Sequence, residues 1–251
     1  MLAMAQTYAP ITETARVSES PDVASSTDEY ATRFNGPAGE YLLDVQNRAV
    51  MRLARPWIQG SVLDVGGGHA QLCRPLLDAG CDVTVLGSEA SCLERPRRIA
   101  GERVSCVVGD LLDPPFLDCA FDVVIAIRML AHIGDTERFI RGLCRIARHA
   151  VIVDYPEIRS INALTPTLYG LKKKLEGNTR TYRMYHRRDL VRIFASHDFG
   201  AQKAIAQFFW PMVLHRKLSS PFLSRALEAP PHLLQLSRWL GSPVILRLNR
   251  I

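Results

Sequence analysis

"VLDVGGGHAQL", residues 62–72, places three consecutive glycines directly after an apolar run that contains one acid, Asp64. Glycine loses more conformational freedom on folding than any other residue, so a glycine triplet needs a structural reason. The flanks supply one, because residues 61–65 predict a short buried strand and residues 69–79 predict a helix with an apolar face. A strand, a glycine turn and a helix N-terminus together are typical of a ligand cradle in α/β proteins.

Strands and helices alternate beyond this stretch. Apolar runs predict further strands at 82–86, 104–108, 121–127 and 150–154, with helices at 93–99 and 136–148 between them. Such alternation indicates a parallel, doubly wound sheet. Two later strands, one after residue 199 and one at 242–248, predict a C-terminal antiparallel hairpin that completes a seven-stranded sheet, with a helical insertion of about thirty residues between its two strands.

The chain has 251 residues, which suits one large domain with additions. Residues 1–27 are rich in Ser, Thr, Ala and Pro and predict a mobile tail. Residues 28–251 are expected to form the domain, which opens with an amphipathic helical region over 29–57, broken at 36–39. Segments 156–185 and 210–240 are the expected insertions or lids.

The positive charge of the chain is local. Residues 170–192 carry eight basic and two acidic side chains, a net charge of +6 that equals the net charge of the whole chain. No apolar run approaches the ~18 residues of a membrane span, and the N-terminus lacks the layout of a signal peptide. The six cysteines form no CxxC pair, which favours reduced thiols and a cytoplasmic location.

Several motifs follow the glycine stretch in a recognisable order. Asp64 with Gly66-x-Gly68-x-Ala70 is followed by VVGDLLDPPF (107–116), FDVVIAIRMLAHIGD (121–135) and YRMYHRRDLVRIFASHDFG (182–200). The set resembles class I S-adenosylmethionine (SAM)-dependent methyltransferases, in particular the type 11 small-molecule enzymes, from about residue 29 to the end of the chain. The resemblance implies a Rossmann-like sheet, a methyltransferase activity and SAM as cofactor.

The resemblance also implies where the methionine part of SAM binds. Gly66 and Gly68 would let the backbone approach it, and Asp64 would accept hydrogen bonds from its ammonium group or from the loop amides. Arg128 would line the end of the strand over 121–127, although a surface position at a strand end would explain this residue equally well.

The residues that would bind the adenosine part of SAM depart from the family pattern at one position. Asp110 maps to the acid that contacts the adenine amino group, a donor that suits a carboxylate, and Leu111 would cover the adenine face. Gly87 stands where the family usually has an acid for the ribose hydroxyls. Ser88 or Glu89 is expected to supply that contact, and an exposed helix-cap role explains Glu89 nearly as well.

Methyl transfer is an in-line displacement that depends on positioning, and an oxygen nucleophile can also need a base. His132, which follows the strand over 121–127, is the leading candidate for that base, and Tyr155 is the second choice. A structural histidine is the competing interpretation. Met129, Leu130 and Ala131 precede His132 in place of extra acids, so we expect no catalytic metal.

The acceptor is expected to lie under the N-terminal helix, the basic 155–185 segment and the apolar 210–240 segment. A basic rim beside an apolar cover favours an acidic or amphiphilic small molecule, and it allows a peripheral membrane contact. An oxygen is the preferred acceptor atom because His132 lies in reach of the predicted site. Solvated loops and an ordinary core would also explain the two segments. RNA methylation and a non-catalytic SAM-binding role remain alternatives, although no RNA-binding module is visible. An NAD-binding interpretation fails because the second strand lacks a terminal acid and Ala70 replaces the third glycine. The oligomeric state stays open.

Overall fold

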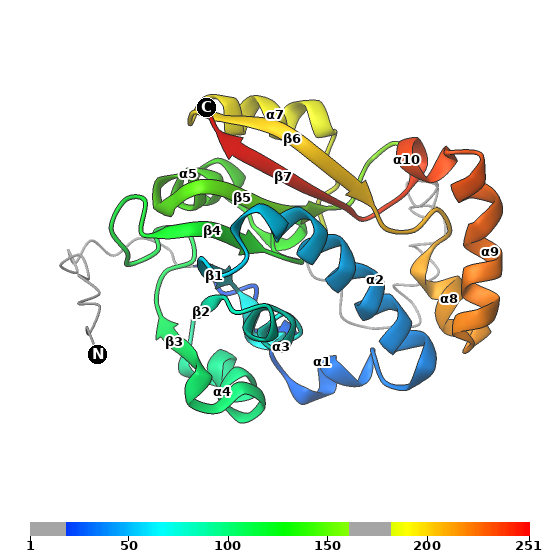
Figure 1. The fold of residues 1–251 in the computed structure, drawn as a ribbon, viewed down its shortest axis with the longest axis horizontal. Coiled ribbons are helices and arrows are strands. Elements are labelled where there is room, and N and C mark those ends of the chain that lie inside the picture. The colour runs from blue at the N-terminus through cyan, green and yellow to red at the C-terminus, as the bar shows by residue number, and fades with distance from the viewer. Residues whose placement is uncertain (1–18, 161–181) are drawn as a thin grey trace.

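The computed structural model of the chain describes residues 19–160 and 182–251. A seven-stranded sheet with the order β3-β2-β1-β4-β5-β7-β6 forms its centre (Figure 1). The strands are β1 (Ser61–Val65), β2 (Asp82–Gly87), β3 (Val104–Val108), β4 (Phe121–Ala126), β5 (Ala147–Tyr155), β6 (Phe199–Ala206) and β7 (Val244–Arg250). The first five run parallel, whereas β7 runs antiparallel to both β5 and β6. This confirms the predicted doubly wound α/β sheet with a C-terminal antiparallel hairpin.

Helices cover both faces of the sheet (Figure 1). They are α1 (Asp28–Thr32), α2 (Gly36–Ala54), α3 (Cys73–Asp78), α4 (Glu94–Ala100), α5 (Thr136–Ile146), α7 (Arg187–Ala195), α8 (Met212–Leu218), α9 (Pro221–Leu233) and α10 (Leu236–Leu240). Short 3-10 turns include η1 (Val23–Ser25), η3 (Gly67–His69), η4 (Ala90–Leu93) and η6 (Leu130–His132). The predicted helical insertion is present as α8–α10, between β6 and β7.

The period of two along each strand divides the apolar residues between two cores. Leu63 and Val65 of β1 face one side and pack with α5 and α7. Val62 faces the other side and packs with α2 and α3. Because both faces are covered, the parallel strands are mostly apolar on both sides, which explains why their runs were readable in the sequence.

Three expected boundaries are wrong. The helix predicted over 69–79 is split, because η3 and a turn occupy its start and α3 begins only at Cys73. Residues 36–39 do not break a helix but form the first turn of α2, where a proline is tolerated. The predicted tail also ends earlier than residue 27, because residues 19–27 contain η1 and a fully buried Asp22.

Much of the basic segment lies outside the described residues, including Lys172, Lys173, Lys174 and Arg180. Within residues 19–160 and 182–251, no helix combines the length and the apolar character needed to cross a bilayer. The chain passes from β1 outward to β3 and returns to β4 beside β1, so the topological switch point lies between β1 and β4. Open α/β sheets bind ligands at the carboxyl ends of the strands at this point.

Candidate functional site

The glycine stretch closes the carboxyl end of β1. Gly66 has a φ of +70°, and its N–H donates to the carbonyl of Leu86 at the end of β2 (2.8 Å). A side chain there would overlap the thioether of Met129, and one at Gly68 would overlap the hydroxyl of Ser26. Glycine is therefore required for conformation at residue 66 and for space at both positions.

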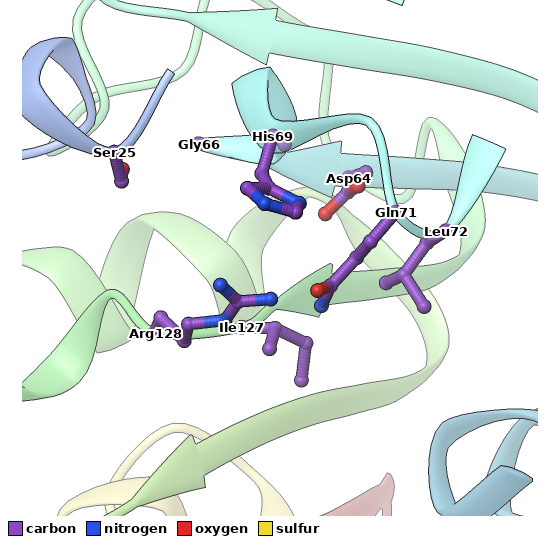
Figure 2. Close-up of a pocket in the computed structure, with 9 residues that line it drawn as sticks. Ser25, Asp64, Gly66, His69, Gln71, Leu72, Ile127 and Arg128 are labelled. Atoms are coloured by element: carbon purple, nitrogen blue, oxygen red, sulfur yellow. The ribbon is translucent and has the colours of Figure 1, made fainter. Parts of the chain in front are cut away.

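A small pocket, open to solvent, lies beside this loop (Figure 2). It is lined by Ser25, Asp64, Gly66, Gly67, His69, Gln71, Leu72, Ile127 and Arg128. These residues come from the ends of β1 and β4, from the turn before α3 and from η1. The pocket thus lies at the switch point where the fold predicts a ligand.

The pocket holds opposite charges close together. Asp64 is buried, and burial raises its pKa to about 7 although Arg128 lowers it. The backbone N–H of Arg128 donates to Asp154 (2.5 Å), which is also buried. Burial raises the pKa of Asp154 to about 6, again against the effect of Arg128. Gln46 of α2 joins the cluster by donating to Asp154 (3.4 Å) and accepting from the Arg128 guanidinium (3.1 Å).

Aromatic rings surround the Arg128 guanidinium. Its central carbon lies 4.6 Å from the ring centroid of Phe34 and 6.0 Å from that of Tyr30. His69 meets both rings edge-on, and burial, together with the charges of Arg128 and Arg95, lowers its pKa to about 3. Within the described part of the chain, neither ring nitrogen of His69 nor Nη1 of Arg128 has a hydrogen-bond partner. Buried polar atoms without partners are uncommon and suit a site that receives a polar ligand.

The N-terminal segment crosses the same end of the sheet. The carboxylate of Asp22 accepts from the backbone N–H (2.9 Å) and the hydroxyl (2.5 Å) of Ser88, directly after β2. Glu19 accepts from the backbone N–H groups of Gly134 (2.5 Å) and Asp135 (2.9 Å), which follow β4. Residues 19–27 therefore lie across the carboxyl ends of the strands, with Ser25 in the pocket wall.

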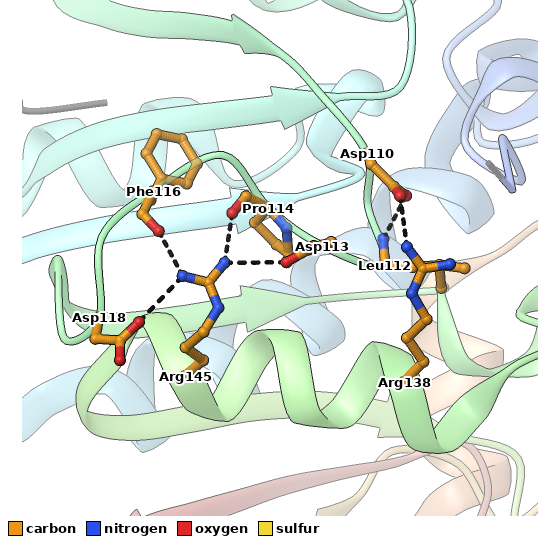
Figure 3. A network of polar contacts seen from close by, with 8 residues as sticks. All are labelled: Asp110, Leu112, Asp113, Pro114, Phe116, Asp118, Arg138 and Arg145. Carbon is orange, nitrogen blue, oxygen red and sulfur yellow. Dashed lines mark hydrogen bonds and ion pairs between the residues drawn. The ribbon is translucent and has the colours of Figure 1, made fainter. Parts of the chain in front are cut away.

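The other predicted cofactor residues lie outside the pocket wall. Asp110 accepts from the backbone N–H of Leu112 and pairs with Arg138 of α5, both at 2.9 Å (Figure 3). Leu111 is fully buried in the core. Glu89 is exposed, and its carboxylate accepts from the Ser91 hydroxyl at 3.5 Å. The structure thus brings Asp64, Gly66 and Arg128 together, and it places Gly68 beside them under Ser26.

The two predicted catalytic residues occupy different environments. His132 ends η6 after β4, is half-buried, and meets the exposed Tyr182 edge-on, with ring centroids 6.0 Å apart. Tyr155 is fully buried at the end of β5, where its hydroxyl donates to Glu157 (3.4 Å). Burial, followed by the charge of Glu157, raises the pKa of the Tyr155 phenol. Neither side chain lines the pocket described above, and no cluster of three or more metal-ligating side chains occurs in residues 19–160 or 182–251.

Sequence reasoning missed Gln46, His69 and Asp22. Gln46 had a usable signal, because it is a polar residue at helical spacing between the apolar Leu42 and Val50 on the buried face of α2. His69 was visible inside the glycine stretch. Nothing in the sequence indicated a role for Asp22, since the residues around it have the composition of a tail and its partner Ser88 lies 66 residues away.

Comparison with known proteins agrees with this arrangement. A family model described as a methyltransferase domain matches residues 63–153, from β1 to β5. Norajmaline N-methyltransferase from Rauvolfia serpentina is 31% identical over 121 residues, 45% of this chain and 40% of that protein. Ajmaline N-methyltransferase from the same organism is 49% identical over 75 residues, 30% of this chain and 25% of that protein. These matches therefore span less than half the length of the two relatives.

Solved structures share the fold. Magnesium protoporphyrin IX methyltransferase from Synechocystis PCC 6803 with bound SAH matches with a TM-score of 0.62 and 16% identity, over 90% of this chain and 96% of that one. A geranyl diphosphate methyltransferase in complex with SAM matches with a TM-score of 0.59 and 16% identity, over 82% and 84% of the two chains.

Proposed function

We propose that this chain, whose residues 63–153 match the methyltransferase domain, is a class I SAM-dependent methyltransferase that transfers a methyl group from SAM to a small-molecule acceptor. The observation that carries the proposal is the pocket at the switch point. Its wall combines the buried carboxylate of Asp64 with the guanidinium of Arg128, beside a glycine turn that a side chain would fill.

These residues fit the methionine part of SAM, which carries an ammonium and a carboxylate. Asp64 would accept from the ammonium, and Arg128, whose Nη1 lacks a partner in the described part of the chain, would donate to the carboxylate. Asp154 and Gln46 would hold Arg128 in place.

The adenosine part would extend from Gly68 toward the ends of β2 and β3. Ser88 or Glu89 would bind the ribose hydroxyls, and Asp110 would accept from the adenine amine with Leu111 beneath it. On binding, the Asp110 carboxylate would give up its ion pair with Arg138 in favour of the adenine amine. Ser26 would move away from Gly68, because its hydroxyl now fills the space directly beside that glycine.

The bound cofactor supplies a methyl group on a sulfonium, which is already electrophilic. The work of the chain is then to position the acceptor and to exclude water. For an oxygen acceptor, His132 would take the proton. Tyr155 is the second candidate for this base.

A cation close to His132, Arg183, supports the proposal that the acceptor is acidic or amphiphilic. The exposed Arg183 donates to the carbonyl of Gly134 (2.6 Å), and its backbone N–H donates to Ala131 (2.9 Å). A nitrogen acceptor is the second candidate, because both Rauvolfia relatives are named as N-methyltransferases. An amine that reacts in its neutral form needs no base, so the two candidates differ in their dependence on His132.

Calorimetric titration with S-adenosylhomocysteine, adenosine and NAD tests the proposal. We expect the wild type to bind S-adenosylhomocysteine and not NAD. Arg128→Gln should weaken this binding by about 10- to 100-fold, the cost of losing a hydrogen bond to a charged group. Adenosine, which lacks the amino-acid part, should bind both proteins equally.

Arg148→Gln is the matched control, because Arg148 pairs with Asp122 at the opposite end of the strands. It should bind like the wild type. Absence of binding by folded wild-type protein, or a loss in Arg128→Gln that is equal for adenosine, would overturn the proposal.

A further inference from the structure

Helix α9 is amphipathic, but its polar face points into the protein and its apolar face points to solvent. Its buried residues include Ser224 and Glu228, whereas its exposed residues include the large apolar side chains Phe222 and Leu233. Phe222 is 77% exposed and Leu233 is 85% exposed. Their spacing of eleven residues places them on one stripe of the helix, three turns apart, with Ala226 and Ala229 between them.

The buried polar face of α9 binds the turn that precedes α8. The carboxylate of Glu228 accepts from the backbone N–H groups of Phe209 (2.9 Å) and Trp210 (3.0 Å), and it contacts Nε2 of His215 (3.0 Å). These bonds hold the turn between β6 and α8. Because the inner face is used in this way, the outer apolar stripe has no role in the core of the domain.

The apolar surface continues onto α10. We define the C-terminal apolar surface by its six exposed residues, Phe222, Leu223, Leu233, Leu234, Leu236 and Trp239. Leu234 is 67% exposed and Trp239 is 72% exposed. Figure 1 shows α9 and α10 together at one end of the molecule, at its outer edge. Six large apolar side chains exposed on two consecutive helices favour a binding surface over singly scattered surface residues.

The charges of the same segment have one sign. Lys217 and Arg238 are exposed on α8 and α10. Arg216 and Arg225 are exposed as well, but their guanidinium groups lie over the rings of Phe34 and Tyr41. Residues 207–243 contain a single acid, Glu228, and it is buried. Segments in which exposed leucine, phenylalanine and tryptophan alternate with basic and not acidic surface residues are typical of helices that lie in the interface of an anionic bilayer.

We propose that the C-terminal apolar surface docks on an anionic lipid surface, with the stripe of α9 and Trp239 entering the headgroup region and the cations Lys217 and Arg238 meeting the lipid phosphates. This contact is independent of the proposed methyl transfer, since none of its residues lines the pocket at the end of β1. It needs no helix that crosses the bilayer.

Co-sedimentation with vesicles tests the contact. The full chain should bind vesicles of phosphatidylcholine and phosphatidylglycerol at a 3:1 ratio, and it should bind pure phosphatidylcholine vesicles at least about 10-fold more weakly, since each basic residue contributes about 1 kcal/mol near an anionic surface. Raising the salt to about 0.5 M should release it, because the Debye length then becomes short.

The triple variant Phe222→Ser/Leu233→Ser/Trp239→Ser should lose vesicle binding while it keeps its thermal transition, because these side chains are already exposed. Leu117→Ser is the matched control, since Leu117 is a 47% exposed leucine in the turn before β4. It should bind vesicles like the wild type.

Equal binding of the triple variant and the wild type would overturn the proposal. So would a wild-type dimer that the triple variant dissociates, because a second copy would then cover the surface. Failure of the wild type to bind either vesicle would also overturn it, whatever its affinity for S-adenosylhomocysteine.

Discussion

The carboxylate of Asp22 holds both the backbone N–H and the hydroxyl of Ser88, across 66 residues of sequence. This contact holds the N-terminal segment 19–27 against the residue that follows β2. The segment therefore lies at the carboxyl ends of the strands, where the adenosine part of SAM would lie. Ser26 of the same segment fills the space beside Gly68. The segment therefore competes with the proposed cofactor for part of its site.

Removing the contact between Asp22 and Ser88 should raise the affinity of the site for its cofactor. We expect Asp22→Ala to bind S-adenosylhomocysteine about 3- to 10-fold more tightly, because the apparent affinity is the intrinsic affinity multiplied by the fraction of molecules in which the site is open. Isothermal titration measures the change. Glu29→Ala, an exposed acid on α1, should leave the affinity as it was. Weaker binding by Asp22→Ala would mean instead that this carboxylate contacts the cofactor.

Sequence reasoning found the parts of the site that are local in the chain. Gly66 and Gly68 were readable because a glycine turn directly after an apolar strand is typical of a ligand-binding loop in α/β sheets. Ala70 was interpreted as a replaced glycine, and its φ of +61° confirms that this position adopts the conformation that favours glycine. Arg128 was placed by its position after an apolar strand.

Contacts between distant segments were not readable. Asp22 reaches Ser88, and Gln46 reaches Asp154 across 108 residues. Neither pair follows from any local pattern, because the tertiary fold alone brings these side chains together. The same limit hid the contact between Asp110 and Arg138, which depends on how α5 packs beside the loop after β3.

Asp64 should make the stability of the protein depend on pH. Burial raises its pKa from 3.8 to about 7. The folded state then favours the protonated carboxyl, so stability is lost as pH rises from about 4 to about 7. At pH 8 we expect Asp64→Asn to be more stable than the wild type by about 1–4 kcal/mol, and at pH 4 the two should be alike. Urea unfolding at both pH values gives the free energies of unfolding.

Asp122→Asn provides a control of opposite sign. Burial raises the pKa of Asp122, but hydrogen bonds from Ser61 and the charge of Arg148 outweigh it, so the net pKa is lowered. Its contribution to stability is present at neutral pH and is lost as pH falls below about 4. Asp122→Asn should therefore be less stable than the wild type at pH 8. A loss of stability in Asp64→Asn at pH 8 would contradict the first prediction.

His132 distinguishes the two acceptor classes. With an oxygen acceptor, His132→Ala should lower kcat by about 10²- to 10⁴-fold and remove the acidic limb of the pH–rate profile, with the affinity for S-adenosylhomocysteine unchanged. His149→Ala is the control, because His149 is half exposed and stacks on Trp57 near the start of β5. An unchanged kcat in His132→Ala with a productive acceptor would exclude this residue as the base and favour a nitrogen acceptor.

Glu228 and Ser224, one helical turn apart on the buried face of α9, should respond in opposite ways to substitution by alanine. Glu228 accepts hydrogen bonds from two backbone N–H groups and contacts His215, so Glu228→Ala leaves two buried groups and one half-buried group without their partner. We expect a loss of about 2–5 kcal/mol in the free energy of unfolding, measured with urea. The Ser224 hydroxyl is buried without a partner in the described part of the chain, so Ser224→Ala removes a desolvated group and should be neutral or stabilising. Equal losses in the two variants would mean that the inner face of α9 is held by packing volume and not by the Glu228 carboxylate.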